Sequence, residues 1–279
     1  MSFKGIYAAL SGSMAQTLKI DTIANNIANV NTTGFKKDQQ TFGEYLTAIE
    51  KQPEVLSMSR IPSSIENMYN TNGTEKSFVD STGTYTNFEQ GSLKSTGGKL
   101  DVAIDGEGFF EISTPQGIKL TRAGNFTIDG QGKLVNKEGN TVVVEQDGQI
   151  ENDEADKNKS NSFAQFSGIS QAYISDSGEV FDGDRKLGKL SVLKLSNPDC
   201  LQKVGNNYYT YKKNMNPEVS QLKNLSLKQG YLETSNVNIV SEMTDMIMAQ
   251  RVFEGTQKVI QAFDQMEDKL INQVGSTRG

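Results

Sequence analysis

Apolar residues recur at helical spacing near the start of the chain. A spacing of four and three residues places one stripe on a helix surface, made of Ile6, Ala9, Ser13, Gln16, Ile20, Ile23, Ile27 and Val30. This pattern predicts a helix over residues 6–30, although Ser13 and Gln16 put polar groups in the middle of the stripe. We expect the helix to end within residues 29–34, because asparagine tolerates the left-handed conformation and Gly34 suits the position just beyond a helix.

A second and longer helix is predicted over residues 238–274. Its apolar residues recur at every seventh position, as Ile239, Met246, Phe253 and Ile260. Gln250 and Gln257 lie along the same seam, where leucine is expected. At 1.5 Å per residue this helix is roughly 55 Å long, more than a small β-domain covers. We therefore expect the two terminal helices to pair with each other as a coiled coil.

The period changes to two in the middle of the chain. Leu100, Val102 and Ile104 alternate with Asp101, Ala103 and Asp105, which is typical of a strand. The run DGQG at 129–132 is typical of the turn of a β-hairpin. Short strands between Gly and Asp turns predict a mainly antiparallel β-domain over residues 85–227. Residues 37–84 are polar and contain prolines, so we expect an extended connector there, with little core of its own.

The expected fold class is therefore α+β. The expected division is an N-terminal helix segment 1–36, the connector 37–84, the β-domain 85–227 and a C-terminal helix segment 228–279. Hydrophobic residues make up 35% of the 279 residues, and the mean hydropathy is -0.51. Both values are low for one compact core of this length, which agrees with elongated parts around a modest β-domain.

Composition argues against several classes of function. The net charge of -6 and the lack of a basic run disfavour nucleic-acid binding, which needs clustered Lys and Arg. No stretch approaches the length of apolar sequence that a transmembrane helix needs. The first residues also lack the apolar run of a signal peptide. We expect a protein that either stays in the cytoplasm or leaves by a route that cleaves nothing.

Nothing in the sequence points to catalysis. The chain has no histidine, which excludes Ser–His and Cys–His nucleophile pairs and the common zinc ligand sets. The single cysteine, Cys200, therefore lacks a basic partner. Carboxylates cluster in three turn-like segments, Asp105/Glu107, Asp153/Glu154/Asp156 and Asp182/Asp184. Such pairs can serve acid–base chemistry or bind Ca²⁺, but none matches an EF-hand loop, and we expect solvated loops, no metal and no cofactor.

Asparagines gather at the end of the first helix, at Asn25, Asn26, Asn29 and Asn31. A helix cap followed by a loop explains residues 31–34. It does not explain Asn25 and Asn26, because asparagine is unfavourable inside a helix. Buried asparagines that set the register between neighbouring helices would explain both.

These residues resemble the flagellar rod and hook axial protein family. The N-terminal signature is present as ALSG at 9–12 and NNIANVNTTGFK at 25–36. The C-terminal signature is similar to GYLETSNVN at 230–238, followed by MAQR at 248–251. The runs LDVAIDGEGFF at 100–110, LTRAGNF at 120–126 and NPDCLQKVGNNY at 197–208 resemble the entrance and exit of the family's β-domain.

Within the family, hook proteins are longer and the short rod proteins lack the β-domain. The run QGSLKSTGGKLDVAIDGEGFF and the ending FDQMEDKLINQVG look most like the proximal rod members. Distal rod members are second, because residues 46–80 do not clearly resemble their insertion. A secreted adhesin and a peptidoglycan hydrolase are alternatives from other classes.

The resemblance implies a structural subunit of the flagellar basal-body rod, polymerising helically through its terminal helices. Its implied partners are further copies, neighbouring rod, hook and ring proteins, and the flagellar type III export apparatus. The residues expected to carry assembly are Ile20, Ile23, Asn25, Asn26, Ile27, Asn29, Asn31, Gly34, Phe35, Met243, Met246, Gln250, Phe253, Gln257 and Ile260.

Overall fold

The computed structural model describes residues 4–47, 76–145, 166, 172–212, 219–221 and 226–276. The chain divides into two compact units. The first contains helix α1 (Lys4–Ala28) as far as Asn25, strands β1 (Asp38–Thr47) and β2 (Lys76–Thr86) as far as Tyr85, and helix α3 (Ile239–Ser276) from Val240. The second contains residues 26–37 and 86–239.

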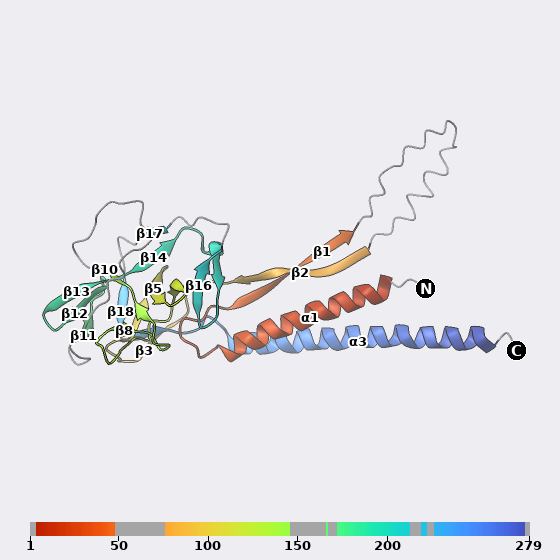
Figure 1. The fold of residues 1–279 in the computed structure, drawn as a ribbon. Coiled ribbons are helices and arrows are strands. Elements are labelled where there is room, and N and C mark those ends of the chain that lie inside the picture. The colour runs from red at the N-terminus through yellow and green to blue at the C-terminus, as the bar shows by residue number, and fades with distance from the viewer. Residues whose placement is uncertain are drawn as a thin grey trace, which may run out of the picture. The chain divides into compact units, whose positions relative to one another are not determined.

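Both predicted helices are present (Figure 1). Helix α1 ends at Ala28, one residue before the expected window. Its last turn tightens, since Asn29 N donates to Asn26 O at 3.1 Å and Val30 N donates to Ile27 O at 3.2 Å. Helix α3 has Glu242 in its first turn, where a carboxylate is favoured by the helix dipole.

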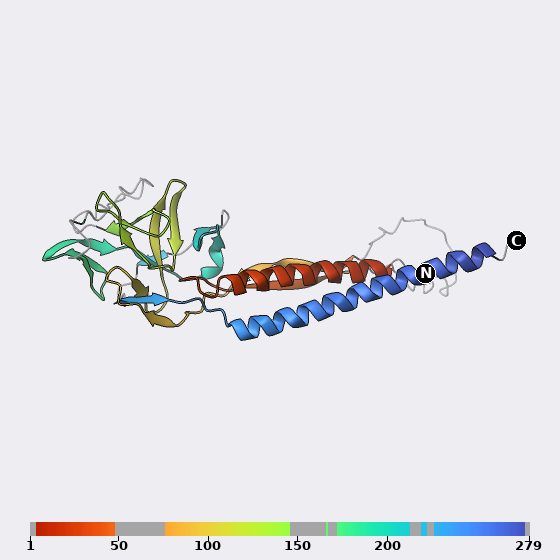
Figure 2. The ribbon, with the colours of Figure 1, turned by 90° about the horizontal axis from the view of Figure 1, so that it is seen from below.

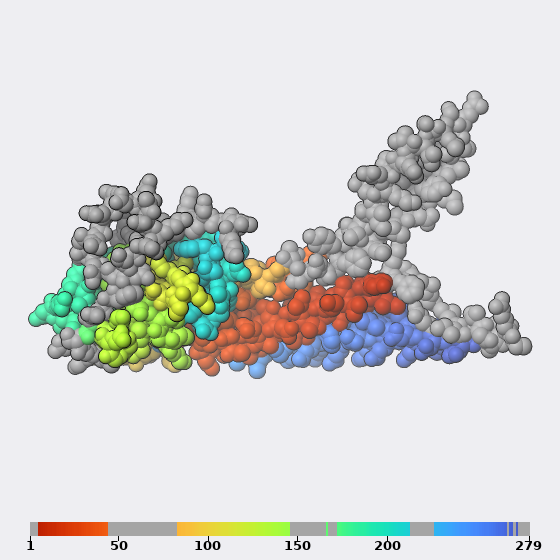
Figure 3. All heavy atoms as spheres, in the orientation of Figure 1, coloured from red at the N-terminus to blue at the C-terminus, as the bar shows by residue number. Residues whose placement is uncertain are grey.

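Helices α1 and α3 lie side by side and run in opposite directions within the first unit (Figures 1 and 2). Gln257 Nε2 donates to Ser13 Oγ at 3.2 Å. A Cβ on Gly5 would lie 3.0 Å from the ring of Phe263. In the space-filling view the atoms of α1 lie directly against those of α3 (Figure 3). Each helix therefore covers part of the other's apolar surface.

The segment 37–84, expected as an extended connector, forms a β-strand at each of its two ends. Strands β1 and β2 pair as a two-stranded sheet. Gln40 Oε1 accepts hydrogen bonds from Thr84 Oγ1 at 3.0 Å and from Thr22 Oγ1 of α1 at 3.3 Å. Both strands contain Thr, Tyr and Phe, which favour extended structure. They contain few aliphatic residues, so the sequence pattern did not predict them. Residues 48–75, also assigned to the connector, lie outside the described residues.

The second unit contains the predicted antiparallel β-structure, and every strand pairing described within it is antiparallel. One sheet contains β5 (Phe109–Thr114), β6 (Gly117–Thr121), β7 (Thr127–Ile128), β8 (Leu134–Val135), β9 (Thr141–Val142), β14 (Val192–Leu195), β15 (Leu201–Lys203), β16 (Tyr208–Tyr211) and β17 (Val219–Gln221). A second contains β10 (Val144–Glu145), β11 (Ala172–Ile174), β12 (Glu179–Asp182) and β13 (Arg185–Leu190). The hairpin predicted at 129–132 joins β7 to β8.

Two strand pairs bring the beginning and end of this unit together. Strand β4 (Val102–Ile104) pairs with β18 (Leu227–Gln229), and β3 (Leu93–Ser95) pairs with β19 (Tyr231–Glu233). The segment predicted as 228–279 is therefore not helical throughout. Its first residues complete the β-domain, and helix α3 begins at Ile239, one residue after the start predicted for the long helix.

Two apolar clusters lie among the described residues of the β-domain. One surrounds Phe110, whose ring meets that of Phe126 edge to face at 5.2 Å. The other joins Phe88, Phe109 and Tyr209, with ring centroids 5.4–5.7 Å apart. Cys200 ends the short 3₁₀ helix η2 (Pro198–Cys200) and is buried in the second cluster. These clusters give the β-domain a core of its own.

Candidate assembly surface

Some of the residues predicted to carry assembly are buried or half-buried where α1 and α3 pack together, a contact that we call the seam. Ile23 is buried on α1 and Ile20 is half-buried. On α3, Met246, Phe253 and Ile260 are half-buried, as expected for residues on the seam. Gln257 is half-buried and holds Ser13 by its hydrogen bond. Ser13 and Gln257, one polar residue from each predicted stripe, thus contact each other within one chain.

Two of the predicted α3 residues face outward. Met243 is exposed, and so is Gln250, which therefore does not lie on the seam with Gln257. Gln250 precedes Gln257 by seven residues and so lies within about 20° of it around the helix, but it is Gln257 that donates the hydrogen bond to Ser13 of α1. The buried seam positions Glu242 and Ala249 were missed, since a short or charged side chain gives no apolar signal.

The outer faces of both helices remain apolar in places. On α1 the exposed apolar residues are Tyr7, Leu10, Met14 and Leu18, and Met14 is 63% exposed. On α3 they are Ile239, Val240, Met243, Ile247, Met248, Val252, Val259 and Met266. Contiguous exposed apolar surface of this kind marks an interaction site.

The asparagine-rich signature begins where α1 ends. Asn26 is 1% exposed, whereas Asn25 and Asn31 are exposed. Ile27 and Asn29 are half-buried. Within a single chain, the burial expected of both Asn25 and Asn26 is therefore found only at Asn26. A role of these residues in setting register between neighbouring copies stays a prediction.

Gly34 and Phe35 are buried in the second unit. Gly34 has φ +67°, and its N donates to Glu233 O at 2.9 Å. A Cβ on Gly34 would lie 2.6 Å from backbone atoms of Arg122 and Ala123. Phe35 lies under the Lys203 ammonium, whose Nζ is 4.1 Å from the ring centroid. The signature is thus held against the β-domain by close backbone contact.

Replacing Gly34 by alanine should destabilise the β-domain by about 2 kcal/mol or more, because a positive φ and a backbone clash act together. Denaturant unfolding followed by near-ultraviolet dichroism of the tyrosines measures the loss. Gly139→Ala is the matched control, since Gly139 has φ +81° but open space around its Cβ position. Equal losses in the two variants would contradict the close-approach argument.

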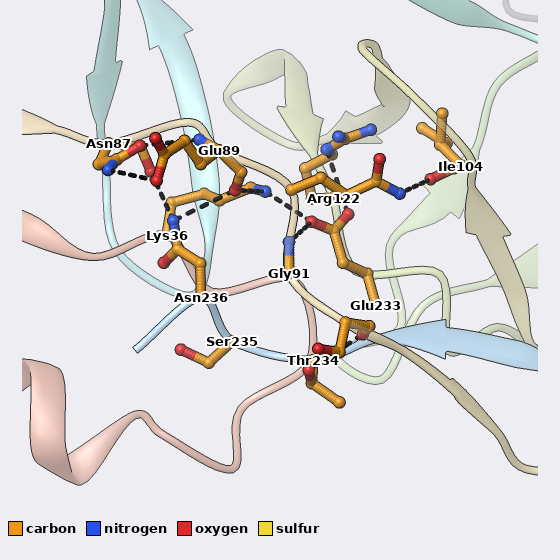
Figure 4. A network of polar contacts seen from close by, with 12 residues as sticks. Lys36, Asn87, Glu89, Gly91, Ile104, Arg122, Glu233, Thr234, Ser235 and Asn236 are labelled. Carbon is orange, nitrogen blue, oxygen red and sulfur yellow. Dashed lines mark hydrogen bonds and ion pairs between the residues drawn. The ribbon is translucent and has the colours of Figure 1, made fainter. Parts of the chain in front are cut away.

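Lys36 enters a buried network of charged groups (Figure 4). Its Nζ donates to Glu233 Oε1 at 2.5 Å and to Glu89 O at 2.6 Å. Arg122 Nε lies 3.3 Å from Glu233 Oε2, and Gly91 N donates to Glu233 Oε1 at 2.9 Å. Lys36, Arg122 and Glu233 are each at most 4% exposed. We call this group the Lys36 clasp, because it joins residues that are 197 positions apart.

Burial governs the electrostatics of the clasp. Removal from water lowers the pKa of the Lys36 ammonium below its ordinary value, while the nearby Glu233 carboxylate acts in the opposite direction. Burial also lowers the pKa of the Arg122 guanidinium. Asn236 extends the clasp, since its Oδ1 accepts from Lys37 N at 2.8 Å and its Nδ2 donates to Asn87 O at 2.9 Å. The two buried cations, Lys36 and Arg122, thus both form their ion pair with the Glu233 carboxylate.

Comparisons with known proteins match the same parts of the chain. Residues 6–36 match the family model described as flagella basal body rod protein, and residues 228–273 match flagellar basal body rod FlgEFG protein C-terminal. Residues 103–181 match the flagellar hook protein FlgE/F/G D1 domain. The flagellar basal-body rod protein FlgG of Bacillus subtilis is 34% identical over 277 residues, covering 96% of this chain and 98% of the relative. The chain belongs to the flagellar basal-body rod protein family.

Other rod proteins of the family match over similar lengths. FlgG of Borreliella burgdorferi is 32% identical, with 94% of this chain and 96% of the relative covered. FlgF of Caulobacter vibrioides is 28% identical, with 97% of each chain covered. The resemblance identified from the terminal signatures is therefore confirmed. Relatives named FlgG and FlgF both extend along nearly the whole chain, so the position along a rod stays a prediction.

The carboxylates and the cysteine considered for catalysis or metal binding make ordinary ion pairs and hydrogen bonds where the structure describes them. Asp105 pairs with Lys228 at 2.8 Å and Glu107 pairs with Lys194 at 2.7 Å. Cys200 is buried, and its Sγ donates a hydrogen bond to Asn197 O. Asp182 lies in β12, and the cluster at 153–156 lies outside the described residues. Among the described helices, none combines the length and apolar character needed to cross a membrane.

Proposed function

We propose that copies of this rod-family chain polymerise helically through α1 and α3, and so build the drive shaft and export channel of the flagellar basal body. The observation that carries this proposal is the apolar outer surface of both helices, which a single chain leaves exposed. Covering it by neighbouring copies removes apolar area from water. Contacts between unlike faces of successive copies generate an open helix without a closed ring.

In this proposal α1 and α3 pair as a coiled coil within each copy. Their antiparallel arrangement and the Gln257–Ser13 hydrogen bond support it, as does the heptad recurrence of Met246, Phe253 and Ile260. The clasp then ties the residues after α1 to those before α3, so that the N-terminal signature ends and the C-terminal signature begins at the β-domain.

The proposed partners are neighbouring rod, hook and ring proteins of the basal body, and the flagellar type III export apparatus that delivers the chain without a cleaved signal peptide. We keep the proximal rod as the proposed position and the distal rod as its alternative. Locating a tagged chain in isolated basal bodies by electron microscopy tests the position. The proposed role is structural and involves no catalysis, cofactor or nucleic acid. Release of peptidoglycan fragments by the purified chain would favour a hydrolase instead.

Deleting residues 239–276 should abolish incorporation into rods and leave a folded β-domain. The reason is that α3 contributes no residue to either apolar cluster of that domain. Motility and the composition of isolated basal bodies report incorporation in a bacterium that lacks its own copy of the gene. Near-ultraviolet dichroism of the purified variant checks the fold, with the full chain as control. Recovery of the truncated chain in rods would overturn the proposed function.

A further inference from the structure

The outer face of α1 carries one continuous stripe. Tyr7, Leu10, Met14 and Leu18 follow each other at helical spacing and are all exposed. The same line continues through exposed Asp21 and Asn25. Counting about 100° per residue, this stripe lies opposite the face that buries Ile23. From Tyr7 to Asn25 it is about 27 Å long. We call it the α1 outer stripe.

Helix α3 carries a second stripe that the seam with α1 does not use. Spacings of four and three link six exposed residues, Met248, Val252, Gly255, Val259, Ala262 and Met266. From Met248 to Met266 this stripe is also about 27 Å long. We call it the α3 lateral stripe, because it lies about 120° around the helix from the buried seam.

Gly255 is the unusual member of the α3 lateral stripe. Glycine within a helix is less favourable than alanine by about 1 kcal/mol. A Cβ on Gly255 would meet no atom within 4 Å, so packing within the chain does not require glycine there. Its neighbours on the stripe are apolar and exposed, which leaves a gap on the helix surface between Val252 and Val259.

We propose that the α1 outer stripe of one copy packs on the α3 lateral stripe of a neighbouring copy, with Leu18 inserted at Gly255. This inference rests on the proposed function, because it needs copies that assemble. It specifies which faces meet and in which register. The α1–α3 seam within each copy uses other residues, such as Ile23 and Phe253, and so both contacts can exist together.

Three features favour a second copy of this chain as the occupant. The two stripes have equal length, and one is bulky where the other has a gap, as knobs-into-holes packing requires. In an assembly of like-oriented copies, α1 of one copy and α3 of the next run antiparallel, as they do within the chain. Aligning Tyr7 with Met266 in that direction places Leu18 opposite Gly255.

The third feature is charge. The same alignment places Asp21 of the α1 outer stripe next to Arg251, which with Lys258 lies along one flank of the α3 lateral stripe. Asp21, Arg251 and Lys258 are all exposed. Opposite charges at the edge of an apolar contact favour this register over its alternatives.

Cross-linking tests the contact directly. Leu18→Cys and Gly255→Cys variants are produced together in a bacterium that lacks its own copy of the gene, and isolated basal bodies are oxidised. A disulfide between the two variants can only join different copies, and its geometry requires Cα atoms within about 7 Å. We expect a product of twice the chain mass. The pair Leu18→Cys with Gln261→Cys is the matched control, because Gln261 is exposed on another face of α3, and it should give none.

A steric exchange gives an independent readout. Gly255→Leu fills the gap and should abolish rod formation, although leucine favours the helix itself. Leu18→Ala in the same chain should restore rods, and Gln261→Leu should leave them unchanged. Unaltered rods with Gly255→Leu, no rescue by Leu18→Ala, or cross-links to a different protein would each overturn the inference. Because the unsubstituted chain still forms rods in those cases, the proposed function would stand. Failure of the unsubstituted chain to form rods would overturn both.

Discussion

Replacing Glu233 by alanine should lower the free energy of unfolding of the β-domain by about 3–5 kcal/mol. The Glu233 carboxylate is the acceptor for Lys36 Nζ at 2.5 Å and for Gly91 N at 2.9 Å, and it lies 3.3 Å from Arg122 Nε. Without it, both buried cations lose the carboxylate that they contact directly. A domain with a typical stability of about 5–15 kcal/mol loses a large share of it. Urea unfolding of the full chain, followed by tyrosine dichroism, measures the change.

Glu107→Ala is the control for this prediction. Glu107 pairs with Lys194 at the surface, with both side chains exposed, and pairs of that kind contribute about 0–1 kcal/mol. Lys36→Met should fall between the two variants, because Arg122 and Glu233 then remain as a balanced pair. If Glu233→Ala and Glu107→Ala lose the same stability, the clasp does not hold the β-domain together.

Periodicity predicted the elements whose pattern is local. Helix α3 follows from the seven-residue recurrence of Met246, Phe253 and Ile260, and the hairpin between β7 and β8 follows from its DGQG turn. In both cases the signal lies within a short window, so neighbouring residues are enough to specify the structure.

Local pattern could not reveal contacts between distant residues. Lys36 and Glu233 occur in separate signatures, and nothing near either residue in the sequence indicates the other. Strand β1 likewise pairs with β2, and the sequence between the two strands contains no pattern that indicates this pairing. The outer face of α1 was missed for a different reason. Leu10 and Met14 lie outside the stripe that predicted the helix, and the structure places both on the exposed side.

Replacing Gly124 by alanine should destabilise the β-domain by about 3 kcal/mol or more, because the added methyl group has no space. A Cβ on Gly124 would lie 1.7 Å from Val102 O and 3.3 Å from the ring of Phe110. Val102 and Phe110 are both 0% exposed, so neither can move into solvent. Val102 N also donates to Gly124 O at 3.0 Å, and separating the two segments breaks this bond.

Gly130→Ala isolates the steric part of this effect. Gly130 lies in the turn between β7 and β8, with no atom within 4 Å of a Cβ, and its replacement should change stability by about 0.5 kcal/mol or less. Calorimetric or urea unfolding of the two variants gives the comparison. A loss confined to Gly124→Ala means that the run LTRAGNF is needed because the backbone at Gly124 touches that of Val102. Equal stability of both variants would show instead that strand β4 can shift to admit a methyl group.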